Sequence, residues 1–546
     1  MRNVKGETPH FGYRFRVNRR DFTTGAALLV GTTLLDLPAA AQMPGETVET
    51  TAGRVRGMRV EGIHAFKGIP YGASTAGANR FMPPRKPQAW AGVRDAFRFG
   101  HQSPQNMRFT DVLAPQADPR EGFDEDCLVL NVWTPGVDDG AKRPVMFWTH
   151  GGGFAQESGS WPWIDGTALA RRGDAVVITI NHRLNIFGYL DLGSVGGEKY
   201  AASGNAGMLD LVAGLEWVRD NIEQFGGDPS NVTIFGESGG GAKVCTLLAM
   251  PAAKGLFHRA AIQSGAWLRA QTREEATDVS DAVLRDLGIT AANIDEIQRV
   301  PVDRLLALRA GAMGPDASGE IRMGYSPVVD GEILPGHPFD PLATPVSADI
   351  PLIVGCTRYE TTLFSLGDES VFSLDEAGLR ARVRDFFDDE STVARAIETY
   401  RRSNPGANAS DIFFLMTSDR MVRRDTIRLA ERKHGQGRAP VYQYRFDWHS
   451  PALGGRLRSA HTVEIPFVFD NTDVPKVMTN SPRAAALAAK TSSAWIAFAR
   501  TGNPNHPGLP EWPAYTLDDR ATMVFDDVST VFNDPGAAER QFWNDV

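Results

Sequence analysis

Ser238 lies in the segment Gly236-Glu237-Ser238-Gly239-Gly240, where glycines flank a potential nucleophile on both sides. The apolar run Val232–Phe235 precedes this segment, and a helix is expected to follow from about Gly241 to Met250. A serine on so sharp a turn is lifted above the end of its strand, because glycine tolerates the backbone conformations that the turn requires. The helix that begins there adds a positive dipole end close to the hydroxyl. Ser238 is therefore predicted to be the nucleophile of an acyl-transfer reaction.

Three consecutive glycines follow another apolar run, in His150-Gly151-Gly152-Gly153. Backbone N–H groups without side chains around them can approach a ligand oxygen closely. Acyl transfer needs such donors around the negatively charged oxygen of its tetrahedral intermediate, and losing one donor costs about 3 kcal/mol of transition-state stabilisation. We assign Gly152, Gly153 and Gly239 as the donors of an oxyanion hole.

A serine hydroxyl also needs a histidine base and a carboxylate that orients it. After a serine turn of this kind, the acid and then the histidine follow on loops that come after strands. The formal candidates for the base are His258, His337, His434, His449, His461 and His506. The loop after the expected strand Val441–Phe446 contains both His449 and His461, and their spacing does not separate them.

Glu360 is the favoured acid, because it lies just after the expected strand Pro351–Val354 on a short turn. Asp330 is the alternative. The context of Asp330, two valines before it and Gly331 after it, is more typical of a surface β-turn.

The elements that position these residues alternate between strand and helix patterns. The apolar runs Pro144–Thr149 and Ala175–Ile180 indicate buried parallel strands, and apolar residues at helical spacing predict a helix over Leu209–Phe225. This alternation predicts an α/β fold with a mainly parallel central sheet covered by helices. Residues at about 270–345 and 365–435 are predicted to be helical or irregular insertions that form a cap or lid region.

The composition is that of a soluble globular protein, with 42% apolar and 23% charged residues among 546. A formal net charge of −9 makes nucleic acid an unfavourable partner. The three cysteines form neither a disulfide framework nor a zinc motif. We predict no cofactor and no metal.

The N-terminus has the pattern of an export signal. Arg19-Arg20 precedes an apolar stretch, Gly25–Leu37, which ends near Ala39-Ala40-Ala41. This order is typical of a cleaved signal peptide, and the paired arginines favour the twin-arginine route over an ordinary Sec signal or an uncleaved anchor. The stretch is also shorter than the roughly 20 residues that span a bilayer, so no stable membrane insertion is expected. We expect residues 1–41 to be the signal, with cleavage near Ala41, and residues 42–546 to be one catalytic domain in an exported, periplasmic or secreted protein.

Several long motifs resemble those of the type-B carboxylesterases, the family that includes cholinesterases and some fungal lipases. The likeness extends from about Gly53 to Phe525. The matching segments are Phe66–Tyr71, Glu125–Asn131, His150–Phe154, Gly204–Gly207, Phe225–Pro229, Phe235–Gly240, Gln263–Gly265, His461–Pro466 and Phe498–Asn505.

The resemblance implies an α/β-hydrolase fold and a carboxylic-ester hydrolase that forms an acyl-enzyme, with a small-molecule ester as its partner. It implies a triad of Ser238, Glu360 and His461, and it favours His461 over His449 because the family's histidine precedes a Glu-Ile-Pro-Phe segment. Ser264 matches a buried serine that supports the triad in relatives, and Glu237 is assigned with it to the surroundings of the triad.

The chain also departs from the family pattern. Relatives often pair the cysteine that matches Cys127 with another, but Ser103 stands at the second position. We therefore expect that disulfide to be absent, and residues 104–126 become a candidate mobile lid. Two other functions fit the same motifs: a binding protein that kept this fold without catalysis, and a hydrolase of amides, carbamates or thioesters. The sequence indicates neither the natural ester nor the oligomeric state.

Overall fold

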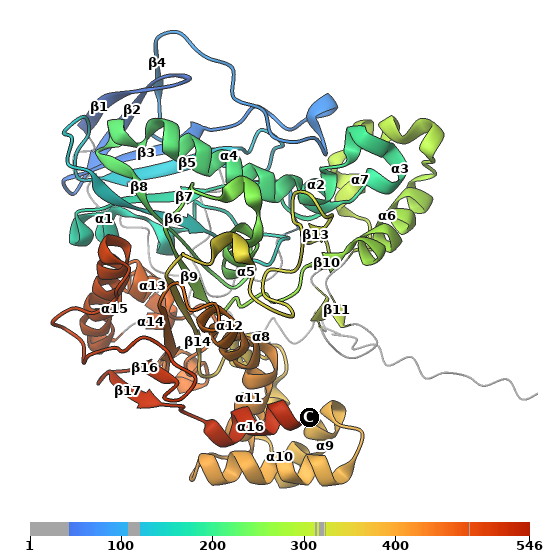
Figure 1. Ribbon diagram of the computed structural model, residues 1–546, viewed down its shortest axis with the longest axis vertical. Helices are drawn as coiled ribbons and strands as arrows, with labels where there is room; N and C mark the ends of the chain where they lie inside the picture. Colours follow the sequence, from blue (N-terminus) through green and yellow to red (C-terminus); the bar gives the residue numbers. More distant parts are fainter. Residues whose placement is uncertain are drawn as a thin grey trace, which may run out of the picture. The chain divides into compact units, whose positions relative to one another are not determined.

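The computed structural model of the chain has one large mixed sheet at its centre, and the central strands of this sheet run parallel (Figure 1). The structure describes residues 43–106, 121–311, 314–315, 321–322, 324–474, 476–479 and 481–546. In these residues thirteen strands form one sheet in the order β1-β2-β3-β5-β7-β6-β8-β9-β14-β15-β16-β17, with β4 beside β2. Neighbouring strands from β7 to β16 are parallel, whereas pairs at both edges are antiparallel.

The strands of this sheet have the following bounds: β1 Met43–Thr50, β2 Gly53–Val60, β3 Ile63–Pro70, β4 Val93–Asp95, β5 Val129–Thr134, β6 Arg143–Thr149, β7 Val176–Ile180, β8 Gly227–Glu237, β9 Arg259–Gln263, β14 Leu352–Thr357, β15 Val441–Phe446, β16 Ala521–Phe525 and β17 Thr530–Asn533. Two small ribbons lie outside it, β10 Gln271–Thr272 with β13 Val328–Val329, and β11 Gly314–Pro315 with β12 Ile321–Arg322.

Helices cover both faces of the central strands, which explains why those strands are apolar throughout. In β6, Val145 and Phe147 enter one core, whereas Met146 and Trp148 enter the other. The first core packs against α4 (Ala206–Asn221), α5 (Gly239–Ala249) and part of α12 (Arg424–His434). The second core packs against α1 (Thr167–Gly173), α13 (Ile465–Val468) and α15 (Pro482–Thr501).

The two regions predicted as insertions contain helices with smaller cores of their own. In the first, α6 (Arg273–Leu287), a 3-10 segment (Ala291–Arg299) and α7 (Val302–Leu306) pack near α2 (Asn185–Tyr189). In the second, α9 (Glu376–Val383), α10 (Glu390–Ser403) and α11 (Ala409–Ser418) gather with the C-terminal α16 (Ala537–Asp545) (Figure 1). The remaining α-helices of the described residues are α3 Gly193–Gly196, α8 Thr361–Phe364 and α14 Lys476–Thr479.

The expected α/β fold with a mainly parallel sheet is confirmed, although some bounds differ. The helix expected over Leu209–Phe225 begins at Ala206, and its last turn, Ile222–Phe225, is 3-10 rather than α. The strand expected at Pro351–Val354 continues to Thr357. β5, which was not expected as a strand, lies between β3 and β7. The predicted signal at residues 1–41 lies outside the described residues.

Candidate active site

Ser238 occupies the turn between β8 and α5, as the glycine pattern predicts. Its backbone has φ 56° and ψ −124°, a conformation that is rare for a residue with a side chain and is typical of strained functional turns. The Ser238 N–H donates to the carbonyl of Gln263 over 2.8 Å. Every residue from Val232 to Met250 is buried except Ser238, which is partly exposed. The turn therefore presents one hydroxyl-bearing residue at the edge of an otherwise closed core.

Close packing explains why Gly240, two positions after Ser238, has no side chain. A Cβ at Gly240 would lie 2.1 Å from the carbonyl oxygen of Thr149 at the end of β6. Only a residue without a side chain lets the start of α5 approach the neighbouring strand so closely.

Glu360 and His461 form a buried pair at the ends of β14 and β15. The Nδ1 of His461 lies 2.5 Å from one carboxylate oxygen of Glu360. The other oxygen accepts from Ser264 Oγ over 2.6 Å and from the N–H of Thr357 over 2.7 Å. A carboxylate held on both oxygens fixes the imidazole tautomer that leaves Nε2 free to accept a proton.

The second imidazole nitrogen lies beside the residue that precedes Ser238. His461 Nε2 is 3.3 Å from Glu237 Oε1, and both side chains are buried. Burial by itself lowers the pKa of His461, but the carboxylates of Glu237 and Glu360 outweigh it and raise that pKa to about 9. Burial raises the pKa of the Glu237 carboxyl well above its ordinary value. The imidazole of His461 therefore lies between the Glu360 carboxylate and the turn that contains Ser238.

The three proposed oxyanion donors come from two segments that touch. Gly152 and Gly153 have φ of 70° and 62°, which glycine adopts at little cost. A Cβ at Gly239 would lie 2.2 Å from the carbonyl oxygen of Gly153, so the start of α5 packs directly on the glycine loop. The structure thus brings Gly152, Gly153 and Gly239 to the same place as Ser238.

The competing candidates lie elsewhere. Asp330 accepts from the N–H groups of Glu332 and Leu334 over 3.0 Å each, which is the turn role expected of it. The His449 ring packs edge-on against Tyr359 at 5.4 Å between ring centroids. The imidazoles of His258 and His506 contact backbone groups of Val232 and Lys490, and His434 packs on Tyr515.

Sequence reasoning missed several residues around the pair. Glu464 is buried and accepts from Tyr444 Oη over 2.8 Å and from Gln263 over 3.3 Å. Burial and the nearby Glu360 raise its pKa to about 8. The spacing of Glu464 three residues after His461 is a signal for its proximity, whereas nothing in the sequence marks the N–H of Thr357 as a partner of Glu360.

Cys127 and Ser103 are both buried, and the three cysteines are free. Ser103 Oγ instead accepts from the N–H of Leu184 over 3.2 Å. The serine thus has a backbone role where relatives often have a disulfide. Most of the candidate lid, residues 107–120, lies outside the described residues.

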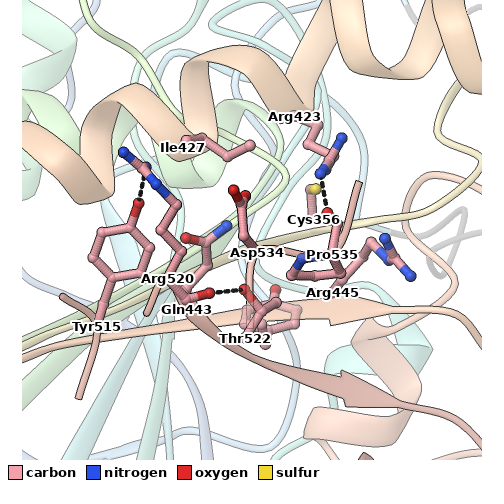
Figure 2. A pocket seen from close by; sticks show the side chains of 11 residues that line it. Cys356, Arg423, Ile427, Gln443, Arg445, Tyr515, Arg520, Thr522, Asp534 and Pro535 are labelled. Carbon is pink, nitrogen blue, oxygen red and sulfur yellow. Dashed lines mark hydrogen bonds between the residues drawn. The ribbon is translucent and has the colours of Figure 1, made fainter. Parts of the chain in front are cut away.

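A separate small cavity lies between α12 and the strands β15 and β16 (Figure 2). It is lined by the side chains of Arg423, Arg445 and Arg520 among others. Each of these guanidinium groups already has a carboxylate partner, at Asp419, Asp447 and Glu431 respectively. The cavity does not include the Ser238 turn, so it is not a candidate for the ester site.

Two further observations concern the described part of the chain. It contains no helix that is both long and apolar enough to cross a membrane. Its His, Cys, Asp and Glu side chains form no group of three that could hold a metal ion.

Known proteins share both the sequence and the fold of this chain. The model of the Carboxylesterase family matches residues 44–543. The para-nitrobenzyl esterase of Bacillus subtilis is 38% identical over 91% of this chain and 98% of its own length. The phenmedipham hydrolase of Pseudarthrobacter oxydans is 35% identical over 88% of this chain and 94% of its own length.

A solved structure agrees with these relatives. The crystal structure of a Geobacillus stearothermophilus carboxylesterase superposes with a TM-score of 0.77 at 42% identity, covering 91% of this chain and 99% of that one. The sequence match, the shared α/β-hydrolase fold and the glycine-flanked serine turn lead to one conclusion: the chain belongs to the carboxylesterase family and is a serine hydrolase of carboxylic esters.

Proposed function

We propose that Ser238, His461 and Glu360 hydrolyse esters through an acyl-enzyme. Ser238 Oγ attacks the ester carbonyl carbon while His461 Nε2 takes the hydroxyl proton. The resulting oxyanion accepts hydrogen bonds from the N–H groups of Gly152, Gly153 and Gly239. The intermediate collapses, and the alcohol leaves with the proton from His461. Water then repeats the attack and releases the acid.

One observation carries this proposal: the two ring nitrogens of His461 face the proposed acid and the turn of the proposed nucleophile. Its Nδ1 meets Glu360 at 2.5 Å, and its Nε2 is 3.3 Å from Glu237, the residue bonded to Ser238. An imidazole oriented on one side and directed at a nucleophile turn on the other is the arrangement that general-base catalysis requires.

The test is the substitution Ser238→Ala together with fluorophosphonate labelling. The wild-type protein should hydrolyse p-nitrophenyl esters and should be labelled once per chain at Ser238. The alanine variant should do neither while it stays folded. Burst kinetics retained in the alanine variant would refute the assignment, and a folded wild-type protein that resists labelling would favour a binding function.

We infer that the leaving group is apolar or aromatic. The Phe364 ring lies 5.0 Å from the imidazole of His461 and is 38% exposed, so it offers an apolar surface beside the proton donor. A relative named for para-nitrobenzyl esters supports this class. Among esters of one acid with alcohols of similar acidity, kcat/KM should fall from the p-nitrobenzyl ester through the benzyl ester to the ethyl ester as apolar contact with the alcohol decreases. Faster cleavage of the matched amide, carbamate or thioester would overturn the ester assignment.

We also propose that the protein is exported through the twin-arginine route. The support is the order of residues 1–41: Arg19-Arg20, the short apolar stretch and Ala39-Ala40-Ala41. Replacing both arginines with lysine should retain esterase activity in the cytoplasm of a bacterial host. Unchanged export of that variant would contradict the twin-arginine route.

A further inference from the structure

Lys243 is a fully buried lysine on α5, five residues after Ser238. Lysine is rarely buried without partners, because removing an ammonium group from water is costly. Its long side chain runs from the nucleophile helix toward the loop that contains Gly152 and Gly153. The proposed chemistry of Ser238 and His461 makes no use of it.

All three donors of the Lys243 ammonium are used on this one loop. The Nζ atom donates to the carbonyl oxygens of His150 over 2.8 Å, Gly151 over 3.2 Å and Gly153 over 2.8 Å. An ammonium has three N–H groups, so the three acceptors satisfy it. The group also lies 5.6 Å from the Phe154 ring centroid, within the range of a cation–π contact.

Because a peptide group is planar, the contacts of Lys243 with the loop carbonyls also fix the directions of the neighbouring N–H groups. The carbonyl of Gly151 and the N–H of Gly152 belong to one planar trans peptide and point in opposite directions. Because Lys243 holds that carbonyl on its own side, the N–H of Gly152 is directed away from Lys243. The ammonium thus fixes the direction of a donor that it does not touch.

The other two proposed donors are the N–H groups of Gly153 and Gly239. In each case, backbone N–H groups bind the carbonyl of the same peptide and so fix the direction of the donor. The Gly152 carbonyl accepts from the N–H groups of Ala155 and Gln156 over 3.1 and 3.2 Å, which orients the N–H of Gly153. The Ser238 carbonyl accepts from the N–H of Ala242 over 3.1 Å, which orients the N–H of Gly239. For the N–H of Gly152 the corresponding carbonyl is that of Gly151, which has two side-chain partners: Lys243 Nζ at 3.2 Å and His150 Nδ1, also at 3.2 Å. Lys243 also accounts for the position of His150, because it donates to the His150 carbonyl.

The acidic residue Glu157 near the loop supports the same role for Lys243. Glu157 lies next to the loop, since a Cβ at Gly151 would be 3.1 Å from Glu157 Oε2. Burial lowers the pKa of Lys243 and raises that of Glu157, and the attraction between the two groups opposes both shifts. The carboxylate therefore favours the ammonium form, in which the nitrogen donates three hydrogen bonds.

We propose that Lys243 is a positioning residue for ester hydrolysis, whose ammonium holds the loop of residues 150–153 so that its N–H groups point at the oxyanion. The proposal rests on the proposed function, in which Gly152, Gly153 and Gly239 form the oxyanion hole. The oxyanion exists only in the transition state and the intermediate. Loss of Lys243 should therefore lower kcat more than it raises KM.

The experiment compares Lys243→Met with a matched control, Lys433→Met. Lys433 is also buried, and its Nζ donates to the carbonyls of Ser347 and Ala348 over 2.7 and 2.9 Å, neither of which belongs to the proposed triad or oxyanion hole. Both variants lose a buried ammonium that holds backbone carbonyls, so a general loss of stability appears in both. Only the Lys243 variant should lose activity per folded active site, counted by complete fluorophosphonate labelling.

For Lys243→Met we expect kcat with a p-nitrophenyl ester to fall by about 10- to 100-fold, somewhat less than the loss of a whole donor. Affinity for a trifluoromethyl ketone, which forms an oxyanion on Ser238, should fall by the same factor, with KM changed by less than about threefold. Lys433→Met should keep both values. Should Lys243→Met not fold, Lys243→Gln, which donates two hydrogen bonds without a charge, carries the same test with a smaller loss.

Unchanged kcat and ketone affinity in the folded Lys243 variant would overturn the proposal, as would a loss confined to KM. These outcomes differ from failure of the proposed function itself. In that case the wild-type protein would not be labelled at Ser238, or Ser238→Ala would retain its activity.

Discussion

The Nδ1 nitrogen of His461 lies 2.5 Å from a carboxylate oxygen of Glu360, although the two residues are 101 positions apart in the chain. Strand register explains this proximity. β14 and β15 are parallel neighbours that end together, with Thr357 opposite Phe446. The loops that follow leave the sheet at one edge, and Ser264, just after β9, meets them there. Three loops that follow adjacent parallel strands thus bring the proposed acid and the proposed base together.

Replacing Glu360 with glutamine should reduce kcat by about 10³- to 10⁴-fold. The amide keeps the size of the side chain but removes the charge that stabilises the imidazolium and fixes its tautomer. Steady-state kinetics with a p-nitrophenyl ester measure the effect. Asp330→Asn is the matched control, since the Asp330 carboxylate accepts only from its own turn and from the Asn205 amide, and its activity should stay within about twofold of wild type. Equal losses in both variants would contradict the assignment of the acid.

The two histidines after β15 should respond oppositely to alanine substitution. His461→Ala removes the proton acceptor and should lower kcat on the order of 10⁴-fold or more. His449→Ala removes a ring contact with Tyr359 and electrostatic contacts with Asp447 and Asp526, none of which involves the proposed triad, and should leave kcat/KM within about threefold. Both variants are compared by circular dichroism before kinetics. A large loss of kcat/KM in a correctly folded His449 variant would contradict the assignment of His461 as the base.

The sequence alone predicts the parts of the site that local patterns determine. The strand, glycine turn and helix around Ser238 are contiguous, so composition and periodicity were sufficient. The pairing of Glu360 with His461 depends on the register of β14 and β15, which no local pattern encodes, and the resemblance to a family was needed to choose between His449 and His461. The contacts of Glu464 with Tyr444 and Gln263 join three separate segments and could not be predicted.

Removing the Glu237 charge should shift the pH profile of kcat/KM. Glu237, Glu360 and Glu464 face His461 and raise its pKa to about 9 against the effect of burial. Attack by Ser238 needs neutral His461, so activity should rise with pH up to that pKa. Glu237→Gln removes one negative charge 3.3 Å from Nε2, which lowers the pKa and moves the acid limb to lower pH.

The shift is measured as kcat/KM between about pH 5 and 10, with Asp330→Asn as a variant whose lost charge does not face the imidazole. In the Glu237 variant, the acid limb of the kcat/KM profile could instead stay in place or move to higher pH. Either result would mean that the Glu237 carboxyl carries no negative charge when the substrate is attacked.

The pair formed by Arg183 and Asp210 should contribute strongly to stability. Both side chains are almost completely buried, and the guanidinium donates to both carboxylate oxygens over 2.6 and 2.8 Å. Arg183→Met leaves the carboxylate without its counter-charge and should lower the free energy of unfolding by about 3–5 kcal/mol, measured by urea denaturation.

An exposed pair offers the comparison for this prediction. Arg402 and Glu398 lie 2.8 Å apart on α10 with side chains 73% and 72% exposed, so Arg402→Met should cost less than about 1 kcal/mol. The double variant Arg183→Met with Asp210→Leu should be more stable than Arg183→Met alone, because the uncompensated buried charge is gone. If the double variant were instead the less stable of the two, the penalty would have to come from lost packing rather than from the unpaired carboxylate.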